Sequence, residues 1–125
     1  MITVGVIQEC LKECSASTYY QKVGAVIFSG KRILGSGHNG IRSTSAIHDK
    51  YKNYINSLHA EQDALRNLNW VKLKGSSILV LRISKTLNIL SNAKPCPMCE
   101  KLLQHIGIKN IFYSDKNGQI VKLKN

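Results

Sequence analysis

Three residues of this sequence carry side chains from which proteins build zinc sites. His59 lies in the stretch LHAEQDAL, and Cys96 and Cys99 lie in the stretch KPCPMC. One imidazole and two thiolates make three protein ligands, the number typical of a catalytic zinc whose fourth tetrahedral position holds water. The three residues are therefore predicted to bind one catalytic Zn²⁺. A structural zinc site and a redox-active thiol pair are the alternatives.

Glu61 follows His59 by two residues, a spacing that suits a proton-transferring group. Two residues turn a helix by about 200°, so Glu61 need not coordinate the metal that His59 binds. Zinc lowers the pKa of bound water to about 7 in well-studied sites. A carboxylate beside that water can move its proton to a leaving group. Glu61 is therefore predicted to be the catalytic residue.

Both motifs lie where helices are predicted to begin. Ser57 can cap a helix starting at Leu58 or His59, and the apolar side of this helix would be formed by Ala60, Ala64, Leu65 and Leu68. Helix N-termini carry partial positive charge, which favours thiolate over thiol. Two helices that begin at the same edge of a sheet would bring the three ligands together.

The second of these helices has signals at both ends. Pro97 can occupy its first position, with Cys96 at the cap and Cys99 in the first turn. The helix is predicted to run to about Ile106, because Gly107 suits a helix C-terminus.

The other elements predict an α/β fold. Apolar residues recur at helical spacing from Ile2 to about Ala16. Strands are expected at KVGAVIFSG (22–30), KRILGSGHNG (31–40), SSILVLRIS (76–84), KNIFYS (109–114) and QIVKL (119–123). This order fits a three-layer α/β/α arrangement with a five-stranded mixed sheet. The short DKNG turn predicts an antiparallel hairpin for the last two strands. Residues 41–57 are polar and irregular, with a possible helical turn at YKNYINS, and residues 85–94 are expected to form a loop.

Composition limits the class of protein. The chain has 125 residues, which suits a single domain over 1–125, and its apolar runs are far shorter than the ~20 residues that span a membrane. No N-terminal signal pattern is present, so a cytoplasmic location is expected. Cys10 and Cys14 fall on the buried stripe of the first helix, where core thiols are favoured over a second metal site. The net charge of +11 favours polyanionic partners such as nucleotides or nucleic acid, or a solubilising lysine surface.

HAE at His59–Glu61 and PCPMC at Pro95–Cys99 resemble the signature of the cytidine and deoxycytidylate deaminase superfamily. VGAVIFSGKRILGSGHNG and GIKNIFYSDKNG extend the likeness over roughly Val23 to Leu123. The resemblance implies a cytidine deaminase-like fold, one Zn²⁺ per subunit, and a homo-oligomer, as a dimer or tetramer. It also implies that zinc-bound hydroxide attacks C4 of cytosine. Glu61 would take the water proton, protonate N3 and help ammonia leave, which gives uracil.

The same resemblance suggests substrate-binding residues. Asn39 would contact the sugar, although an Asn-Gly pair is also common in plain turns. The backbone N–H of Ala60 and the region of Pro95 and Cys96 would orient the base. Lys94, where relatives more often carry a small or acidic residue, would face a substrate phosphate or solvent.

The substrate is left open among several hypotheses. A free cytosine nucleoside or nucleotide (cytidine, deoxycytidine or dCMP) is favoured by small size and by the short final turn, which resembles the free-nucleoside enzymes. His59 instead matches the nucleotide and polynucleotide branches. Single-stranded DNA or RNA is favoured by the +11 charge and by aromatic residues that could stack on bases, namely Tyr19, Tyr20, Tyr51, Tyr54 and Trp70. A tRNA adenosine deaminase and a non-catalytic zinc-stabilised domain are less favoured, the latter because Glu61 is intact.

Overall fold

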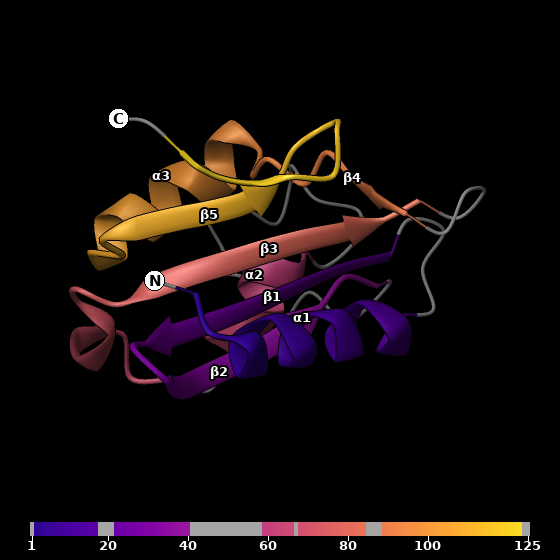
Figure 1. Cartoon of the computed structure of the whole chain (residues 1–125). Coiled ribbons are helices and arrows are strands. Elements are labelled where there is room, and N and C mark those ends of the chain that lie inside the picture. Colours follow the sequence, from indigo (N-terminus) through magenta and orange to yellow (C-terminus); the bar gives the residue numbers. More distant parts are fainter. Residues whose placement is uncertain (1, 18–21, 41–58, 67, 85–88, 124–125) are drawn as a thin grey trace.

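A mixed β-sheet with helices on both faces forms the framework of the molecule (Figure 1). The computed structural model describes residues 2–17, 22–40, 59–66, 68–84 and 89–123. The strand order is β2-β1-β3-β5-β6, with β4 beside β3. The strands are β1 (Lys22–Ser29), β2 (Arg32–His38), β3 (Ser77–Ile83), β4 (Leu90–Ser91), β5 (Asn110–Ser114) and β6 (Ile120–Lys122).

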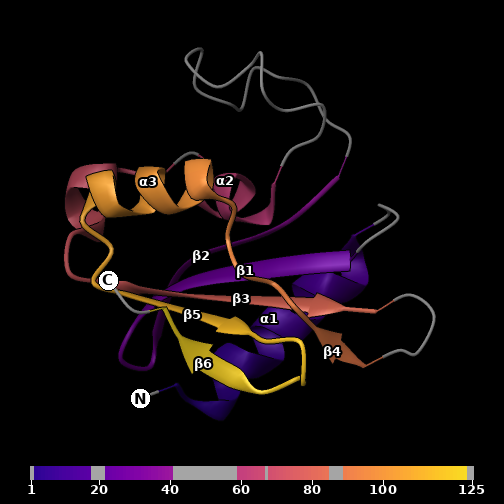
Figure 2. The ribbon, with the colours of Figure 1, turned by 90° about the horizontal axis from the view of Figure 1, so that it is seen from above.

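The helices form two layers (Figure 2). α1 (Val4–Ala16) covers one face of the sheet, and α2 (Ala60–Leu65) and α3 (Pro97–Ile106) lie on the other. A single 3₁₀ turn, η3 (Trp70–Leu73), leads from α2 toward β3. The predicted three-layer α/β/α arrangement is therefore confirmed. Among the described residues, no helix has the length and apolar character needed to cross a membrane.

The strand pairing also agrees with the predicted mixed sheet. β3 and β5 run parallel, and the other pairs are antiparallel, including the β5–β6 hairpin. β4 was not expected, because the sequence suggested only a loop over residues 85–94. Its two residues pair with β3, with Ser91 opposite Arg82 and Leu90 opposite Ile83. The short strand therefore lies beside β3 beyond the point where its pairing with β5 ends.

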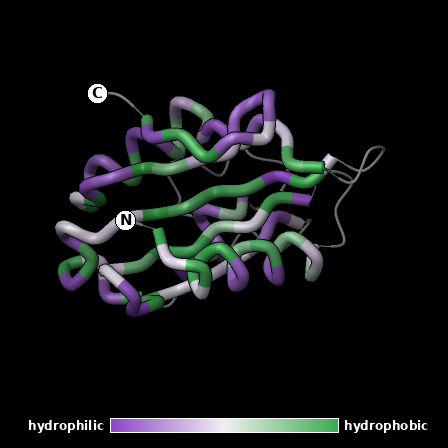
Figure 3. The backbone as a smooth tube through the Cα atoms, in the orientation of Figure 1, coloured by the Kyte–Doolittle hydropathy of each residue, from purple (hydrophilic) through white to green (hydrophobic). Residues whose placement is uncertain are grey.

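Side-chain alternation along β3 divides the core between the two layers. Ile78 and Val80 belong to the cluster beneath α2 and α3, whereas Leu79 and Leu81 belong to the cluster beneath α1. All four are fully buried. The middle of the strand is thus apolar on both faces, and it appears as a continuous hydrophobic stretch in Figure 3. Strands covered on both faces show this continuous pattern instead of strict alternation with polar residues.

Helix α1 packs tightly on the centre of the sheet through its cysteines. The Cys10 thiol donates to the carbonyl of Gly24 at 3.3 Å, and the Cys14 thiol donates to the carbonyl of Leu81 at 3.3 Å. A Cβ on Gly24 would lie 2.5 Å from the Cys10 carbonyl oxygen, so only glycine allows this approach. Both thiols are completely buried in this layer. They are core residues, as the sequence favoured.

The helix boundaries follow the predictions closely at α3 and less closely at α2. α3 runs from Pro97 to Ile106, and Gly107 ends it with a left-handed φ of 97°. α2 begins later than expected, because His59 is its N-cap and not a residue of its first turn. It also ends at Leu65, while Leu68 packs against the core outside the helix. The predicted cap at Ser57, the start at Leu58 and the YKNYINS turn lie outside the described residues.

Candidate metal centre and adjoining cavity

The three predicted zinc ligands lie together where two helices begin. Cys96 is the N-cap of α3, Cys99 is in its first turn, and His59 is the N-cap of α2. His59 Nδ1 lies 3.2 Å from the Cys99 sulfur and 3.8 Å from the Cys96 sulfur. All three donor atoms lie within 4.8 Å of one another. The fold therefore brings together side chains that are 37 and 40 residues apart in the chain.

This spacing suits a tetrahedral zinc ion. Zn–S and Zn–N bonds of about 2.3 and 2.0 Å at tetrahedral angles separate nitrogen from sulfur by about 3.5 Å. The two observed separations lie on either side of that value. Within the part of the chain that the structure describes, no fourth His, Cys, Asp or Glu joins the group. Three ligands of this kind fit a catalytic zinc better than a structural one.

Local structure favours the thiolate form of Cys96. Hydrogen bonds from the side chains of Cys99 and His59 lower the pKa of Cys96 to about 4. The backbone N–H of Cys99 also donates to the Cys96 sulfur at 3.4 Å, as expected at a helix N-terminus. The same interaction with Cys96 raises the pKa of His59. The metal-free group thus holds negative charge on sulfur, which is the form that binds a metal.

Glu61 is in the first turn of α2, directly beside this group. Only 5% of its surface is exposed. Burial raises the pKa of the Glu61 carboxyl, while its own backbone N–H and the neighbouring His59 act in the opposite direction. A raised pKa brings a carboxyl group closer to the range in which it can exchange protons near neutral pH. The environment of Glu61 therefore suits a group that transfers protons.

A cavity of about 320 Å³ opens beside the metal group. Its lining includes the predicted site residues Asn39, His59, Ala60 and Glu61. The rest of the lining is formed by Val23, Arg82, Asn92, Ala93, Lys94 and Cys96. Lys94 is thus placed at the cavity as well, as predicted, whereas Pro95 is buried and does not line the cavity.

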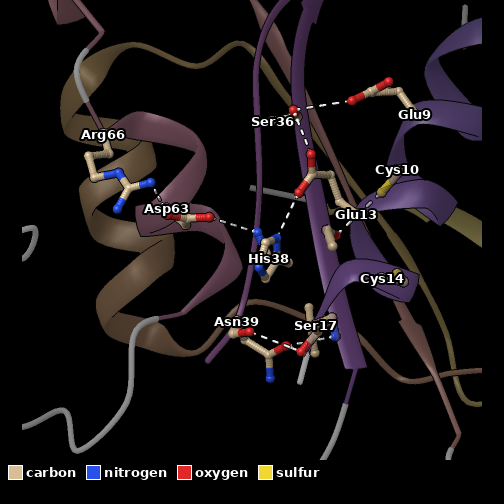
Figure 4. A network of polar contacts seen from close by, with 12 residues as sticks. Glu9, Cys10, Glu13, Cys14, Ser17, Ser36, His38, Asn39, Asp63 and Arg66 are labelled. Atoms are coloured by element: carbon tan, nitrogen blue, oxygen red, sulfur yellow. Dashed lines mark hydrogen bonds and ion pairs between the residues drawn. The ribbon is translucent and has the colours of Figure 1, made fainter. Parts of the chain in front are cut away.

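Asn39 has a structural role in addition to its place in the cavity wall. Its side-chain oxygen accepts hydrogen bonds from the backbone N–H of Val23 at 2.9 Å and from the Ser17 hydroxyl at 2.7 Å. Figure 4 shows the amide oxygen directed toward Ser17. These bonds fix the end of β2 to β1 and to the end of α1. The turn interpretation and the substrate interpretation are therefore compatible.

A polar network holds α2 against the edge strand (Figure 4). Asp63 accepts a hydrogen bond from the backbone N–H of His38 at 3.0 Å and pairs with Arg66 at 3.3 Å. On the other side of the strand, the His38 ring lies 2.8 Å from a carboxylate oxygen of Glu13. β2 is thus tied to both helical layers at a single residue.

The contact between α2 and β2 also requires glycine. A Cβ on Gly37 would collide with the backbone of Asp63 and Ala64, and one on Gly35 would lie 2.8 Å from the Ala64 carbonyl oxygen. The helix therefore rests on the backbone of the strand without an intervening side-chain layer. This close approach sets the distance between the sheet and the residues His59 and Glu61.

Two polar residues of the cavity lining were not identified from the sequence. Arg82 was read as part of a buried strand, and Asn92 as part of a loop. The available signal was a charged residue inside the otherwise apolar run ILVLRI. A charged side chain in a largely buried strand is expected to face a polar region.

The aromatic residues give little support to base stacking. The Trp70 indole donates to the Leu65 carbonyl at 3.3 Å, and the side chain packs against the core. It does not line the cavity. Tyr19, Tyr20, Tyr51 and Tyr54 lie outside the described residues.

Comparisons with known proteins agree with this site. Residues 4–115 match a family model described as the cytidine and deoxycytidylate deaminase zinc-binding region. A comparison with curated protein sequences found no match. The zinc-binding description and the His/Cys/Cys group together support Zn²⁺ as the cofactor.

Solved structures share the fold. The dCMP deaminase of cyanophage S-TIM5, in its apo form, has a TM-score of 0.55 and 23% identity, over 91% of this chain and 86% of that one. The same enzyme solved in complex with dCMP and dUMP has a TM-score of 0.56 and 22% identity, over 92% and 85%. Cytidine deaminase from Burkholderia pseudomallei has a TM-score of 0.64 and 14% identity, over 99% and 93%. The predicted cytidine deaminase-like fold is confirmed.

Proposed function

Because this chain belongs to the cytidine and deoxycytidylate deaminase family, we propose that it converts the cytosine base of a free nucleoside or nucleotide to uracil. The observation that carries this proposal is the position of Glu61. A buried carboxyl with a raised pKa lines the same cavity as the His59 and Cys96 side chains. A structural zinc site has no use for such a group, whereas hydrolytic deamination requires one.

Each residue of the site has a role in this reaction. His59, Cys96 and Cys99 would hold the metal. Zinc, when bound, supplies Lewis-acid activation of water at neutral pH. Glu61 accepts the proton of the attacking water and delivers it to ring nitrogen N3. Glu61 then assists protonation of the amino group, so that addition of water at C4 is balanced by loss of ammonia.

The cavity residues bind and orient the substrate in this proposal. The backbone N–H of Ala60 and the segment of Pro95 and Cys96, of which Cys96 lines the cavity, position the base, and Asn39 contacts the sugar. Asn39 is well suited to this role, because its two hydrogen bonds to Val23 and Ser17 hold its amide in one orientation. A preorganised group of this kind loses little conformational freedom when substrate binds.

A free nucleoside or nucleotide fits the site better than a polynucleotide. The cavity volume of about 320 Å³ lies in the range of pockets that enclose small molecules. The solved dCMP deaminase of S-TIM5 was studied with dCMP and dUMP, which are free nucleotides. The polynucleotide hypothesis keeps one observation in its favour, the net charge of +11.

The deciding experiment is a substrate comparison with zinc-loaded protein. Cytidine, deoxycytidine, CMP, dCMP and a short single-stranded oligonucleotide containing cytosine are each incubated with the protein, and ammonia and uracil are measured. We expect turnover of a free nucleoside or nucleotide. Turnover of the oligonucleotide alone, with a steep loss of binding at higher salt, would establish the polynucleotide hypothesis instead.

Two further parts of the proposal concern the cellular setting. We propose a cytoplasmic location, because thiolate ligands such as Cys96 and Cys99 stay reduced there. We also propose a homo-oligomer, a dimer or tetramer, as in the family that the sequence resembles. Sedimentation equilibrium of the zinc-loaded protein tests the second point, and a monomer at all concentrations would contradict it.

A further inference from the structure

Arg82 lines the cavity from a strand of the sheet. It is in β3, on the same face as Ile78 and Val80, which pack beneath α2 and α3. Alternate residues of a strand share one face, so the side chain of Arg82 points to the layer that carries the metal group. Its presence in the cavity lining agrees with this direction.

The register of the sheet puts Arg82 near the residue proposed to contact the sugar. Val23 of β1 pairs with Arg82 of β3 on one side. On its other side, the Asn39 side-chain oxygen accepts from the Val23 N–H, and the Asn39 N–H donates to the Val23 carbonyl. Asn39, Val23 and Arg82 thus form a row across three adjacent chain segments. Neighbouring strands are about 4.8 Å apart, so the backbones at the ends of this row are roughly 10 Å apart. That distance is on the scale of one nucleotide.

The Arg82 guanidinium has an N–H donor without an acceptor among the described residues. Its Nη1 donates to the Asn92 carbonyl at 3.4 Å, but its Nε is buried and has no acceptor among the described residues. Nor does Arg82 form an ion pair with any carboxylate in the described part of the chain. A buried N–H without an acceptor is costly, and an acceptor carried by a ligand would remove that cost.

The segment that bears Lys94 is held in place against the sheet. The Ala93 N–H donates to the Ser114 carbonyl at 2.8 Å, and the Ser114 hydroxyl donates to the Ser91 carbonyl at 2.7 Å. The Lys94 N–H donates to the Asn92 side chain at 3.2 Å. These bonds position a second cation on the same wall as Arg82, although the Lys94 side chain itself is exposed.

The charge of the cavity favours an anion. Zinc and two thiolates cancel in charge, so the balance is set by the remaining charged groups of the described lining. Those are Glu61, with at most one negative charge, and the two cations Arg82 and Lys94. The cavity is therefore positive overall. Guanidinium groups match the geometry of phosphate oxygens especially well.

We propose that Arg82, together with Lys94, binds the phosphate of a free cytosine nucleoside monophosphate, and that this contact makes the site select nucleotides over nucleosides. The inference rests on the proposed function and narrows its substrate class. It also gives a role to a charged residue in an otherwise apolar strand.

The test compares nucleotide with nucleoside in two independent ways. The first is the ratio of kcat/KM for dCMP to that for deoxycytidine, with the zinc-loaded protein. We expect a preference for dCMP that falls by about 10- to 100-fold in Arg82→Gln, the size expected for a lost charged hydrogen bond. Arg82→Lys keeps the positive charge and should retain part of the preference.

A matched control separates a local effect from a change in net charge. Arg32 is an exposed arginine of β2 that does not line the cavity. Arg32→Gln removes the same charge and should retain the wild-type preference. An unchanged ratio in Arg82→Gln, or equal loss in both variants, would overturn the inference. A wild-type preference for a cytosine oligonucleotide over dCMP would overturn it as well.

The second measurement does not depend on turnover. Binding of dUMP and of deoxyuridine to the zinc-loaded protein is measured by calorimetry, in wild type and in Arg82→Gln. If no substrate is deaminated but dUMP binds more tightly than deoxyuridine through Arg82, the proposed function fails and the phosphate site stands. If deamination occurs and the two ligands bind equally, the phosphate site fails and the proposed function stands.

Discussion

Asp63 accepts a 3.0 Å hydrogen bond from the backbone N–H of His38, and this bond ties the helix that carries Glu61 to the edge strand of the sheet. Asp63 is 7% exposed, so the interaction is shielded from water. Buried hydrogen bonds to a charged group are stronger than those between neutral groups. The position of the helix that carries Glu61 therefore depends on a carboxylate that does not line the cavity.

Replacing Asp63 by alanine should lower the free energy of unfolding by about 1–3 kcal/mol, because a buried N–H loses its acceptor. Urea unfolding of the zinc-loaded protein measures this change. Asp63→Asn keeps an acceptor at the same place and serves as the control, with a smaller loss expected. Equal stability of wild type and Asp63→Ala would show that the bond does not hold the helix.

Glu61→Gln should bind zinc but lose turnover by about 10²–10⁴-fold, the usual contribution of a general acid–base group. Zinc content is measured by elemental analysis and turnover by ammonia release. Glu100→Gln, in the first turn of α3, removes the same charge outside the cavity and should remain active. Full activity of Glu61→Gln would remove Glu61 from its proposed role.

Cys99→Ser should lose zinc and become less stable, because metal binding stabilises only the folded state. Elemental analysis and thermal unfolding with and without added zinc measure the two effects. Cys14→Ser alters an equally buried thiol in the other layer of the core and should keep its zinc. If the metal content of Cys99→Ser is unchanged, the ligand assignment is wrong.

Cys96 should react with iodoacetamide in metal-free protein even in mildly acidic solution. Its pKa is lowered from 9.0 to about 4, so the thiolate is the main form at neutral pH and is lost only as the pH falls through about 4. In urea, the midpoint of the alkylation rate should return toward 9, and bound zinc should protect the thiol. A midpoint near 9 in the folded, metal-free protein would contradict the lowered pKa.

Gly37→Ala should weaken both stability and turnover, because the added Cβ collides with the backbone of Asp63 and Ala64. Displacement of α2 would move Glu61 relative to the zinc ligands. Gly5→Ala in α1 is the control, since its Cβ would meet only the Thr3 hydroxyl at 3.9 Å. That helical substitution should be neutral or stabilising by about 0.5–1 kcal/mol. Normal turnover in Gly37→Ala would show that the site tolerates the displacement.

The sequence was most informative where structure is determined locally. α3 begins at Pro97 and ends before Gly107 as predicted, because a fixed proline φ and a left-handed glycine act through their nearest neighbours. The metal group was predicted for a related reason, since imidazole and thiolate residues at helix starts have few other uses. Signals confined to one helical turn can be read without knowing the rest of the fold.

Features that depend on distant contacts could not be predicted. β4 has two residues, too few to show any periodicity, and forms by pairing with Arg82 and Ile83 of β3. α2 starts after His59, whose ring contacts Cys96 and Cys99 from the other helix. Arg82 looked like part of an apolar strand, because its place in the cavity follows from sheet register. For α2 and Arg82 the deciding partner lies far away in the sequence, whereas β4 is missed because it is so short.

Ser114 links the β5–β6 hairpin to a segment of the cavity wall. No lining residue of the described cavity comes from β5 or β6, yet the Ser114 hydroxyl and carbonyl anchor the segment that leads to Lys94. Substitutions in this hairpin would therefore act on the cavity wall, and on the segment that continues to Cys96, without replacing any residue that lines the cavity.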